Sequence, residues 1–419
     1  MAYLLDIPRQ MRGTIHLPAS KSISNRVLVI GALAGDARLS HLAVCDDTDT
    51  LQAALAQRPY TIDMGAAGTA MRFGTAYFAT QPEEHILTGT ERMRHRPIGV
   101  LVEALRTLGA DIEFAEREGF PPLRIRGRQL RGGSIEMAAN VSSQYISALL
   151  MLGPTLAEGL QLHLSGTVIS RPYIDMTLSL MRSFGAEARW VSDCDIEVAA
   201  KPYRKGQAYT VEADWSAASY WYELVALSPD PEACIYLPHL HANSLQGDSR
   251  VADFFKPLGV ETTFADGEVV LRKTSSEPAD SMLCLDLTRQ PDLAQTIAVT
   301  CAMQRRPFHL TGLQTLKIKE TDRIEALRRE LQKLGCLLTE ANASELIFRP
   351  DAENSIRPAE NPTIDTYDDH RMAMAFAPCA GLFPKLRINH PEVVSKSYPG
   401  FWNDLKSVGV TLDTLPENA

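Results

Sequence analysis

The sequence predicts an α/β fold built from six βαβαββ-type repeats, three in each of two domains, with the first repeat shortened. Two series of residues at a regular period lead to this prediction, together with scattered strand-like runs. In the first series, an amphipathic helix ends in a glycine and a strand follows. The glycines recur at a nearly constant interval, at Gly109, Gly185, Gly259, Gly335 and Gly409. Glycine at this place is typical of a helix C-cap, and the constant interval indicates a repeated unit.

The second series consists of polar residues at or near the starts of apolar helices. Its members recur at nearly the same interval, at Gly68, Ser142, Asp214, Asp292 and Asp369. A sixth member, Ser20, precedes Gly68 by a clearly shorter interval. The helix expected over residues 47–57 ends in Arg58-Pro59 rather than in Leu-Gly. We therefore expect the first repeat to lack about one hairpin, roughly 25 residues.

Short runs of apolar and β-branched residues supply the strands of these repeats. Examples are His163-Leu164, Ile196–Val198, Val269–Leu271 and Glu345–Phe348. The midpoint of the repeats falls near residues 212–216, which we expect to be the hinge. The domains are then residues 14–212, and residues 1–13 with 213–419. We expect the first dozen residues, which precede the first repeat, to pair with the second domain.

Length and composition indicate a two-domain globular protein. A chain of 419 residues exceeds one ordinary core, and 45% hydrophobic with 22% charged residues is a typical soluble composition. The net charge of −9 argues against a protein that coats nucleic acid or an anionic membrane. Seven cysteines without regular spacing favour reduced thiols in a cytosol. With no visible signal peptide or spanning segment, we expect a cytoplasmic protein with no membrane partner.

Helix starts carry unpaired backbone N–H groups and partial positive charge. If the repeats bring six such starts together, they form a site that attracts phosphate and carboxylate groups. The richest start is Lys319-Glu320-Thr321-Asp322-Arg323, followed by an amphipathic stretch. Four-residue spacing predicts that Lys319 and Arg323 point the same way, with Glu320 beside them. Two cations around a carboxylate suit an anionic substrate that gains or loses a proton. A solvated helix start is the alternative interpretation.

Further clusters repeat this chemistry, and each has an ordinary structural explanation. Ser20 to Arg26 joins hydroxyls that can cap a helix with the cations Lys21 and Arg26. Gly65 to Arg72 allows close backbone approach but also suits tight packing, and Arg92 to Pro97 is a basic turn. The other clusters are Ser142-Ser143-Gln144, Pro291-Asp292, Asp369-His370-Arg371 and Lys396-Ser397-Tyr398-Pro399. Capping explains the serines and carboxylates, but it does not require Arg371.

Several common sites are not supported by the sequence. His239 and His241 form an isolated His-x-His motif, with no further ligand at a spacing typical of zinc sites, so we expect no metal there. Neither a nucleotide-binding P-loop nor a Gly-x-Ser-x-Gly nucleophile motif occurs.

The clusters, in this order, resemble the EPSP synthase family. The resemblance extends from Ser20 to Pro399 and includes Ser20-Lys21-Ser22-Ile23-Ser24-Asn25-Arg26, Lys319 to Arg323, and Asp369-His370-Arg371-Met372. It implies two inside-out α/β barrel domains of three repeats each. It also implies transfer of the enolpyruvyl group of phosphoenolpyruvate to the 5-hydroxyl of shikimate 3-phosphate, in aromatic amino acid synthesis. No metal or organic cofactor is implied, and we expect a monomer.

The resemblance also assigns residues to the two substrates. Shikimate 3-phosphate would contact Lys21, Ser22, Arg26, Ser142, Ser143, Gln144, Ser170, Asp292 and Lys319. Phosphoenolpyruvate would contact Lys21, Gly68, Arg96, Gln144, Arg323, Arg371 and Lys396. Asp292 and Glu320 match the proton acceptor and proton donor, and Lys21 is the third catalytic candidate. The amino-terminal domain would then hold shikimate 3-phosphate, and the other domain phosphoenolpyruvate and the proton-transfer residues.

Three departures from the family pattern lie near the phosphoenolpyruvate residues. Ala66 stands where an asparagine is common, Phe73 where a proline is common, and Thr315 where an asparagine is common. We expect an altered affinity for phosphoenolpyruvate and for glyphosate, which competes with it in this family.

Three other classes of protein share parts of this pattern. UDP-N-acetylglucosamine enolpyruvyl transferases usually have Lys-Asn at the first helix and a cysteine near the basic turn. Here Ser22 follows Lys21, and no cysteine lies between Cys45 and Cys194. A non-catalytic anion-binding relative would not need both Asp292 and Glu320. An RNA 3′-phosphate cyclase is disfavoured by the acidic charge and the absence of a nucleotide motif, so no nucleic acid partner is expected.

Overall fold

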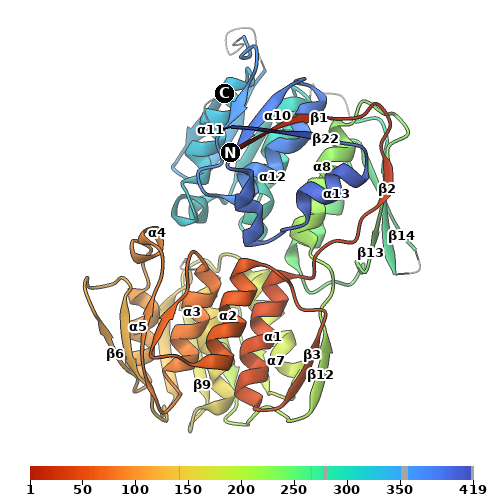
Figure 1. Ribbon diagram of the computed structural model, residues 1–419. Coiled ribbons are helices and arrows are strands. Elements are labelled where there is room, and N and C mark those ends of the chain that lie inside the picture. Colours follow the sequence, from red (N-terminus) through yellow and green to blue (C-terminus); the bar gives the residue numbers. More distant parts are fainter. Residues whose placement is uncertain (141, 266, 277–280, 351–356, 417–419) are drawn as a thin grey trace. The chain divides into compact units, whose positions relative to one another are not determined.

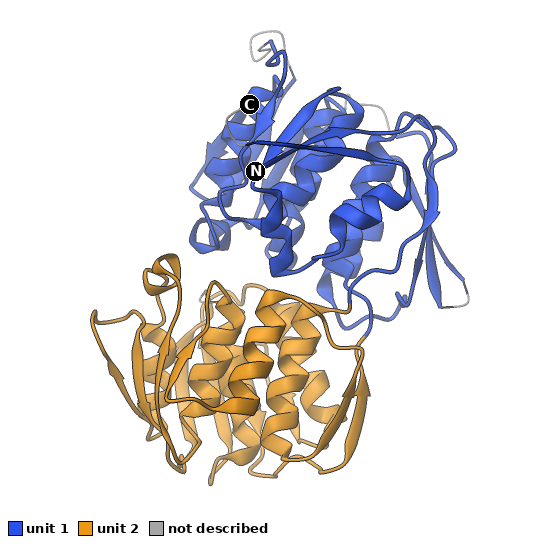
Figure 2. Cartoon of the chain, viewed as in Figure 1, with its two compact units in different colours: residues 1–18, 212–419 blue, residues 19–211 orange. Residues whose placement is uncertain are grey.

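The computed structural model describes residues 1–140, 142–265, 267–276, 281–350 and 357–416 (Figure 1). These residues form a mixed α/β fold with two compact units. Unit 1 contains residues 1–18 and 212–419, and unit 2 contains residues 19–211 (Figure 2). The chain therefore leaves unit 1 after its first two strands and returns to it at Glu212.

Unit 2 has three sheets in the described part of the chain. Its strands are β3 (Ala37–Ser40), β4 (Thr61–Asp63), β5 (Glu84–Thr88), β6 (Asp111–Phe114), β7 (Leu123–Arg126), β8 (Gly133–Ala138), β9 (Leu160–Ser165), β10 (Ala188–Trp190), β11 (Asp195–Val198) and β12 (Gln207–Thr210). Its helices are α1 (Lys21–Ala34), α2 (Asp46–Gln57), α3 (Gly68–Phe78), α4 (Glu91–Arg94), α5 (Gly99–Thr107), α6 (Ser143–Leu152) and α7 (Arg171–Ser183), with a 3₁₀ turn at Gly153–Thr155.

Unit 1 also has three sheets among the described residues. Its strands are β1 (Ala2–Asp6), β2 (Arg12–Thr14), β13 (Cys234–Pro238), β14 (Val260–Ala265), β15 (Glu268–Lys273), β16 (Leu283–Asp286), β17 (Phe308–Thr311), β18 (Leu338–Ala341), β19 (Glu345–Phe348), β20 (Thr363–Ile364), β21 (Leu386–Asn389) and β22 (Thr411–Leu415). Its α-helices are α8 (Trp215–Leu227), α9 (Val251–Phe255), α10 (Ala294–Met303), α11 (Arg323–Lys333), α12 (His370–Phe376) and α13 (Phe401–Ser407). Its 3₁₀ helices are η2 (Gly247–Arg250), η3 (Pro291–Leu293), η4 (Gln314–Ile318), η5 (Ala377–Gly381) and η6 (Pro391–Lys396).

Five of the six sheets, as far as the described residues go, share one strand order. In the sheet β4-β5-β7-β6, the first pair is parallel, and an antiparallel hairpin completes the sheet. Three more have the same order: β8-β9-β11-β10, β2-β13-β15-β14 and β16-β17-β19-β18. In the fifth, β20-β21-β1-β22, strand β1 from the chain start takes the third place, so the antiparallel pair of β1 and β22 is not a hairpin. The sixth sheet has only β3 and β12, which are parallel. After α2, the chain passes from Arg58 through Tyr60 directly into β4, which belongs to a different sheet. The β3–β12 sheet therefore has no hairpin of its own.

The chain start completes two sheets of unit 1. Strand β1 pairs with β21 and β22, and β2 pairs with β13. This confirms the expectation that the first dozen residues pair with the carboxyl-terminal half. The strands expected around His163, Ile196, Val269 and Leu346 are likewise confirmed.

Four of the periodic glycines, Gly109, Gly185, Gly335 and Gly409, lie two residues after a helix, whereas Gly259 lies four residues after α9, and all five stand shortly before a strand. Their φ angles range from 83° to 101°, the left-handed region that ends a helix without a steric penalty only in glycine. The prediction that glycines end these helices is therefore confirmed at four of the five positions, and Gly259 instead ends a turn after α9. The corresponding residue after α2 is Arg58, with φ 45°, so the shortened repeat uses a left-handed arginine instead.

Some helices of each unit are buried in its interior. Nearly every residue of α8 and of α3 is buried. A helix that is apolar on every side is stable only inside a protein. Strands such as β9 and β11 alternate between buried and more exposed residues, so one face of each is turned outward. Helices α1, α3, α6 and α7 pack against one another in unit 2, as do α8, α10 and α12 in unit 1 (Figure 1).

Candidate active site

Arg323 is the centre of a buried charge cluster in unit 1. Its side chain is 2% exposed and contacts three carboxylates. Nε lies 2.7 Å from Asp369 Oδ2, Nη1 lies 3.1 Å from Asp292 Oδ1, and Nη2 lies 3.0 Å from Glu320 Oε2. One guanidinium therefore fixes three carboxylates that come from three separate segments of the chain.

Three more cations surround the same carboxylates. Asp292 lies 3.1 Å from Arg371 Nη2 and 3.4 Å from Lys319 Nζ. Glu320 Oε1 lies 3.3 Å from Lys396 Nζ. We call these seven residues the charge cluster: Asp292, Lys319, Glu320, Arg323, Asp369, Arg371 and Lys396. The cluster has four cations and three carboxylates, a net charge of +1, which suits anionic ligands.

The cations control the protonation of Asp292. Burial alone would raise its pKa, but Arg371, Lys319 and Arg323 outweigh burial and hold the pKa of Asp292 well below its usual range. Asp292 is therefore a carboxylate at neutral pH, the form that can accept a proton once its cations bind other anions.

Helix capping places these side chains. Asp322 caps α11 through hydrogen bonds from the N–H groups of Ile324 and Glu325, both 3.1 Å. Asp369 caps α12 by accepting a hydrogen bond from the Arg371 N–H at 2.9 Å. The interpretation of Lys319 and Arg323 as helical neighbours is wrong, because α11 begins at Arg323 and Lys319 has an extended backbone. The two cations still converge, on Asp292 Oδ1, because η4 turns the chain before the helix.

Asp248 is a residue near the cluster that sequence reasoning missed. It lies in η2, its Oδ2 accepts a hydrogen bond from Ser216 Oγ at 2.5 Å, and its Oδ1 is buried without a partner among the described residues. Burial and then the negative charge of Asp292 raise the pKa of Asp248 to about 7. No local motif marks it, since its hydrogen-bond partner comes from the start of a different helix, α8.

Asp248→Asn should change how stability depends on pH. The folded chain holds a proton on Asp248 up to about pH 7, whereas the unfolded chain releases it near pH 4, so stability falls as pH rises across this range. Asn has no such proton, so we expect the urea midpoint of the variant to fall less between about pH 5 and 8. Asp253→Asn, at an exposed side chain of α9, is the control. Parallel pH profiles for Asp248→Asn and wild type would contradict the expectation.

In unit 2, Lys21 lies at the first position of α1. Ser20 caps this helix, and Lys21 Nζ lies 2.9 Å from Asp47 Oδ2. The side chains are 16% and 4% exposed, so the pair is mostly shielded from water. Asp47 is not among the predicted site residues, because three aspartates in the first turn of α2 are an ordinary match to the positive end of a helix.

Arg26 is buried inside unit 2 and already bonded. Its guanidinium donates to Thr177 Oγ1 at 2.7 Å, Ser147 Oγ at 3.1 Å, and the carbonyl oxygens of Ser22 and Tyr173 at 2.8 and 3.4 Å. These bonds use four of the five N–H donors of an arginine. Burial lowers the pKa of Arg26 to about 10. The ring of Phe73, one of the departures from the family pattern, lies 5.4 Å from the guanidinium carbon.

Gly68 and Arg96 lie in direct contact. A Cβ atom on Gly68 would fall 2.6 Å from Arg96 Nη1, so only glycine leaves the guanidinium where it is. Arg72 holds the surrounding backbone by donating to the carbonyl oxygens of Gly68 at 3.3 Å and Pro97 at 2.9 Å. Within the part of the chain that the structure describes, Arg96 Nε is buried without a hydrogen-bond partner. A buried donor of this kind suits an anion that completes the site.

Gln144 connects two of the predicted helix starts. Its amide Nε2 donates to Thr69 Oγ1 at 3.0 Å, and its backbone N–H donates to the capping Ser142 Oγ at 3.3 Å. Ser170 precedes α7 with a left-handed backbone, φ 53°, and is 6% exposed. Ser143 begins α6 and is half-buried.

The structure thus brings the predicted residues together in groups. Unit 1 joins Asp292, Lys319, Glu320, Arg323, Arg371 and Lys396. Unit 2 joins Gly68 with Arg96, and Gln144 with the helix start at Thr69. That the groups of both units bind one pair of substrates stays a prediction.

One group of possible metal ligands lies on the surface of unit 2. Its members are His163, Cys194 and Asp195, whose ligand atoms lie within 4.8 Å of one another. His163 Nδ1 is 2.7 Å from Asp195 Oδ1, and both side chains are more than a third exposed. An exposed ion pair accounts for this group, so we assign no metal to it.

The chain matches known proteins over nearly its whole length. Residues 42–405 match the family model described as EPSP synthase (3-phosphoshikimate 1-carboxyvinyltransferase). A 3-phosphoshikimate 1-carboxyvinyltransferase of Bacteroides fragilis is 55% identical over 412 residues, which cover 98% of each chain. One from Shewanella pealeana is 35% identical, with 96% of this chain and 98% of the relative covered.

Solved structures agree at the level of the fold. An EPSP synthase from Acinetobacter baumannii superposes with a TM-score of 0.75 at 22% identity, covering 99% of this chain and 100% of the other. Among the helices that the structure describes, none has the length and apolar character to span a membrane. Because the family model matches most of the chain and the two relatives are 55% and 35% identical over nearly its full length, the chain belongs to the EPSP synthase family.

Proposed function

We propose that this chain transfers the enolpyruvyl group of phosphoenolpyruvate to the 5-hydroxyl of shikimate 3-phosphate and releases phosphate. The observation that carries the proposal is the charge cluster of unit 1, in which Asp292 and Glu320 each contact two or more cations. Binding two anions needs cations, but it does not need carboxylates among them. Two carboxylates in this place favour proton transfer next to bound anions.

The proposed reaction has two steps. The 5-hydroxyl loses its proton while its oxygen bonds to C2 of phosphoenolpyruvate, and C3 of phosphoenolpyruvate gains a proton. The resulting tetrahedral adduct then loses a proton from C3 and expels phosphate, which leaves an enolpyruvyl ether. We assign Asp292 as proton acceptor and Glu320 as proton donor, with Lys21 contacting both substrates.

The cations of the cluster have two tasks in this proposal. They bind the substrate phosphate and carboxylate groups, and they hold Asp292 and Glu320 in place through the ion pairs described above. Substrate anions would draw positive charge away from Asp292. Its pKa would then rise toward the range in which it accepts a proton.

The same proposal assigns the remaining substrate contacts. Shikimate 3-phosphate would be bound by Lys21 together with Ser22, Arg26, Ser142, Ser143, Gln144, Ser170, Asp292 and Lys319. Phosphoenolpyruvate would be bound by Lys21 together with Gly68, Arg96, Gln144, Arg323, Arg371 and Lys396. Because four N–H donors of Arg26 already serve internal bonds, we expect it to support Ser22 more than to carry the phosphate.

We extend the proposal to the architecture and to the setting of the enzyme. Each domain would be an inside-out barrel of three repeats, with residues 14–212 on the shikimate 3-phosphate side. Residues 1–13 and 213–419 would supply most of the phosphoenolpyruvate site and both proton-transfer groups. The enzyme would be a cytoplasmic monomer that needs neither a cofactor nor a nucleic acid.

Phosphate release from phosphoenolpyruvate tests the function directly. We expect turnover with shikimate 3-phosphate and none with UDP-N-acetylglucosamine. Turnover only with the sugar nucleotide would support the rival transferase. Binding of both shikimate 3-phosphate and phosphoenolpyruvate without phosphate release would support a non-catalytic relative.

Gly68→Ala should weaken the binding of phosphoenolpyruvate. The new methyl group would overlap the Arg96 guanidinium and force it to move away. The guanidinium can do so because it is the flexible end of its side chain. We expect the KM for phosphoenolpyruvate to rise about tenfold, the loss of roughly one charged hydrogen bond. The KM for shikimate 3-phosphate should change less than twofold. Gly35→Asn, which caps α1 and has open space around it, is the control. Equal changes in both KM values would contradict the expectation.

A further inference from the structure

The segment from Thr363 to Arg371 connects β20 to α12, and α11 holds it at two places. At one end, Arg323 binds Asp369 with distances of 2.7 and 3.3 Å. At the other end, Glu330 binds residues 365 and 367. Arg323 and Glu330 are separated by about two helical turns, so they lie on the same face of α11.

Glu330 is fully buried and accepts three hydrogen bonds. Oε1 accepts from the Tyr367 hydroxyl at 2.6 Å, and Oε2 accepts from the Asp365 N–H at 3.0 Å and Lys333 Nζ at 2.7 Å. A carboxylate on the solvent face of an amphipathic helix would need none of these partners. Three hydrogen bonds to the buried Glu330 carboxylate indicate that Glu330 holds the segment near Asp365 and Tyr367 in a fixed position.

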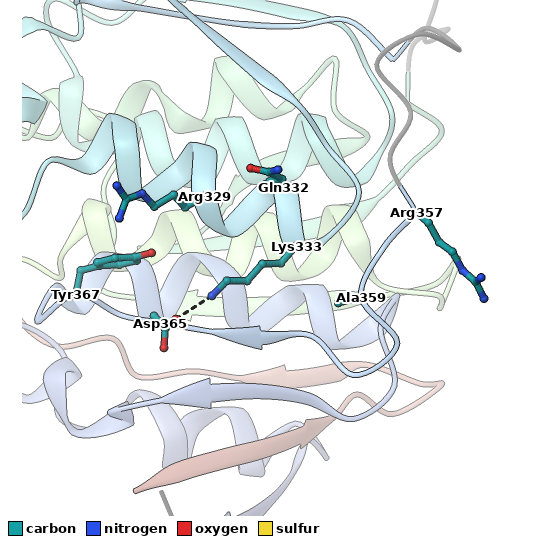
Figure 3. Close-up of a pocket in the computed structure, with 7 residues that line it drawn as sticks. All are labelled: Arg329, Gln332, Lys333, Arg357, Ala359, Asp365 and Tyr367. Atoms are coloured by element: carbon teal, nitrogen blue, oxygen red, sulfur yellow. Dashed lines mark hydrogen bonds and ion pairs between the residues drawn. The ribbon is translucent and has the colours of Figure 1, made fainter. Parts of the chain in front are cut away.

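Lys333 extends this attachment along the segment. Its Nζ also donates to the Thr363 carbonyl oxygen at 3.0 Å and lies 2.8 Å from Asp365 Oδ2. Figure 3 shows Lys333 reaching from α11 to Asp365, in a pocket of about 520 Å³ that Tyr367 also lines. Asp365 in turn accepts a hydrogen bond from Asn389 Nδ2 of β21 at 2.8 Å. The start of the segment is therefore held by α11 on one side and by β21 on the other.

The backbone at Tyr367 and Asp368, just before the attachment at Asp369, is strained. Tyr367 and Asp368 both have left-handed conformations, with φ 53° and 54°. Two such non-glycine residues in a row persist only where their surroundings hold them. The left-handed turn lies between residue 365, which α11 holds through Glu330, and residue 369, which it holds through Arg323.

We propose that Glu330 is a positioning residue for phosphoenolpyruvate binding, acting through Tyr367 and the left-handed turn on Asp369 and Arg371. Asp369 orients Arg323 and caps the helix that carries Arg371. Both arginines are phosphoenolpyruvate contacts in the proposed function, on which this inference rests. The effect of Glu330 reaches the charge cluster through the backbone of the segment.

The test compares the KM values of two variants for the two substrates. Tyr367→Phe removes one hydrogen bond to Glu330, and Glu330→Gln keeps the size of the side chain but removes its charge. We expect the KM for phosphoenolpyruvate to rise about 10-fold in Tyr367→Phe and up to about 100-fold in Glu330→Gln, since small displacements of binding groups have effects of this size. The KM for shikimate 3-phosphate should stay within about twofold of wild type.

Tyr222→Phe is the matched control. It removes a buried tyrosine hydroxyl of the same unit, which lies 3.0 Å from Thr262 Oγ1 and outside the segment. A comparable fall in melting temperature with unchanged KM values is expected there. If Tyr367→Phe and Glu330→Gln also lower only the melting temperature, or raise both KM values equally, the positioning role is refuted. If Glu330→Gln does not fold, Tyr367→Phe alone decides.

Hydrogen exchange separates this inference from the proposed function. Amides of residues 366–371 should exchange faster in Tyr367→Phe than in wild type, while amides of α8 should not change. Unchanged exchange at 366–371 would overturn the inference even if the enzyme is active as proposed. A wild-type protein that releases no phosphate would overturn the proposed function, and exchange would still show whether Tyr367 holds the turn.

Discussion

Glu320→Gln should lower the turnover number for phosphate release by about 10²- to 10⁴-fold, the usual contribution of a positioned acid or base. Glutamine keeps the shape of the side chain and its place between Arg323 Nη2 and Lys396 Nζ, at 3.0 and 3.3 Å, but it cannot pass on a proton. The KM values should change far less than the turnover number. Asp292→Asn should behave in the same way, because Asp292 is the second carboxylate within the same cations.

Glu325→Gln is the matched control for this experiment. Glu325 lies on the same helix and binds Arg328 and Arg329, at 2.8 and 2.7 Å, with a partly exposed side chain. Glu325→Gln should leave the turnover number within about twofold of wild type, because a surface ion pair contributes little. Melting curves would show that each variant is folded. Retention of more than a tenth of wild-type turnover by Glu320→Gln would contradict its role as proton donor.

Arg323→Met should destabilise the protein by about 3–5 kcal/mol near neutral pH. The substitution removes the one group described above that contacts Asp292, Glu320 and Asp369 together, and the side chain of Asp369 is fully buried. Methionine fills much of the volume but leaves buried negative charge without its guanidinium. The urea midpoint at about pH 7 is the measurement.

At acid pH, Arg323→Met should destabilise the protein less than at neutral pH. The direction of this change follows from the pKa of Asp292. Because that pKa is lowered in the folded chain, its contribution to stability is present above about pH 4 and is lost as pH falls toward the lowered value. In Arg323→Met the carboxylates take up protons instead, so the difference from wild type should shrink near pH 4. Arg328→Met, at a half-exposed side chain, should cost less than about 0.5 kcal/mol. An equal loss for Arg323→Met at both pH values would refute the explanation by uncompensated charge.

Local signals made parts of the fold predictable from the sequence. The periodic glycines ended helices because a left-handed residue before a strand is a local requirement, which Gly109 and Gly335 meet. Alternating residues marked strands such as β11 for the same reason. The spacing of Lys319 and Arg323 misled, because it assumed a helix one turn before α11 begins.

The missed residues have a different cause. Asp47, Asp248 and Glu330 are acidic residues in ordinary surroundings, and the sequence offers no pattern that separates them from surface carboxylates. Each is defined by partners from other elements: Lys21 for Asp47, Ser216 for Asp248, and Tyr367 for Glu330. Their burial follows from packing, which a local pattern does not record.

By itself, the sequence determined which residue types stand at the helix starts, the period of the repeats, and the resemblance to a family. Those features depend on neighbours a few residues away, or on motifs that are preserved whole. Only the tertiary structure decided that Arg323 binds three carboxylates at once, that Gly68 leaves room for Arg96, and that Glu330 holds the turn before Asp369. The physical reason is that charge pairing and burial act through space, over distances of about 3 Å, whether the residues are three positions apart, as Glu320 and Arg323 are, or dozens of positions apart.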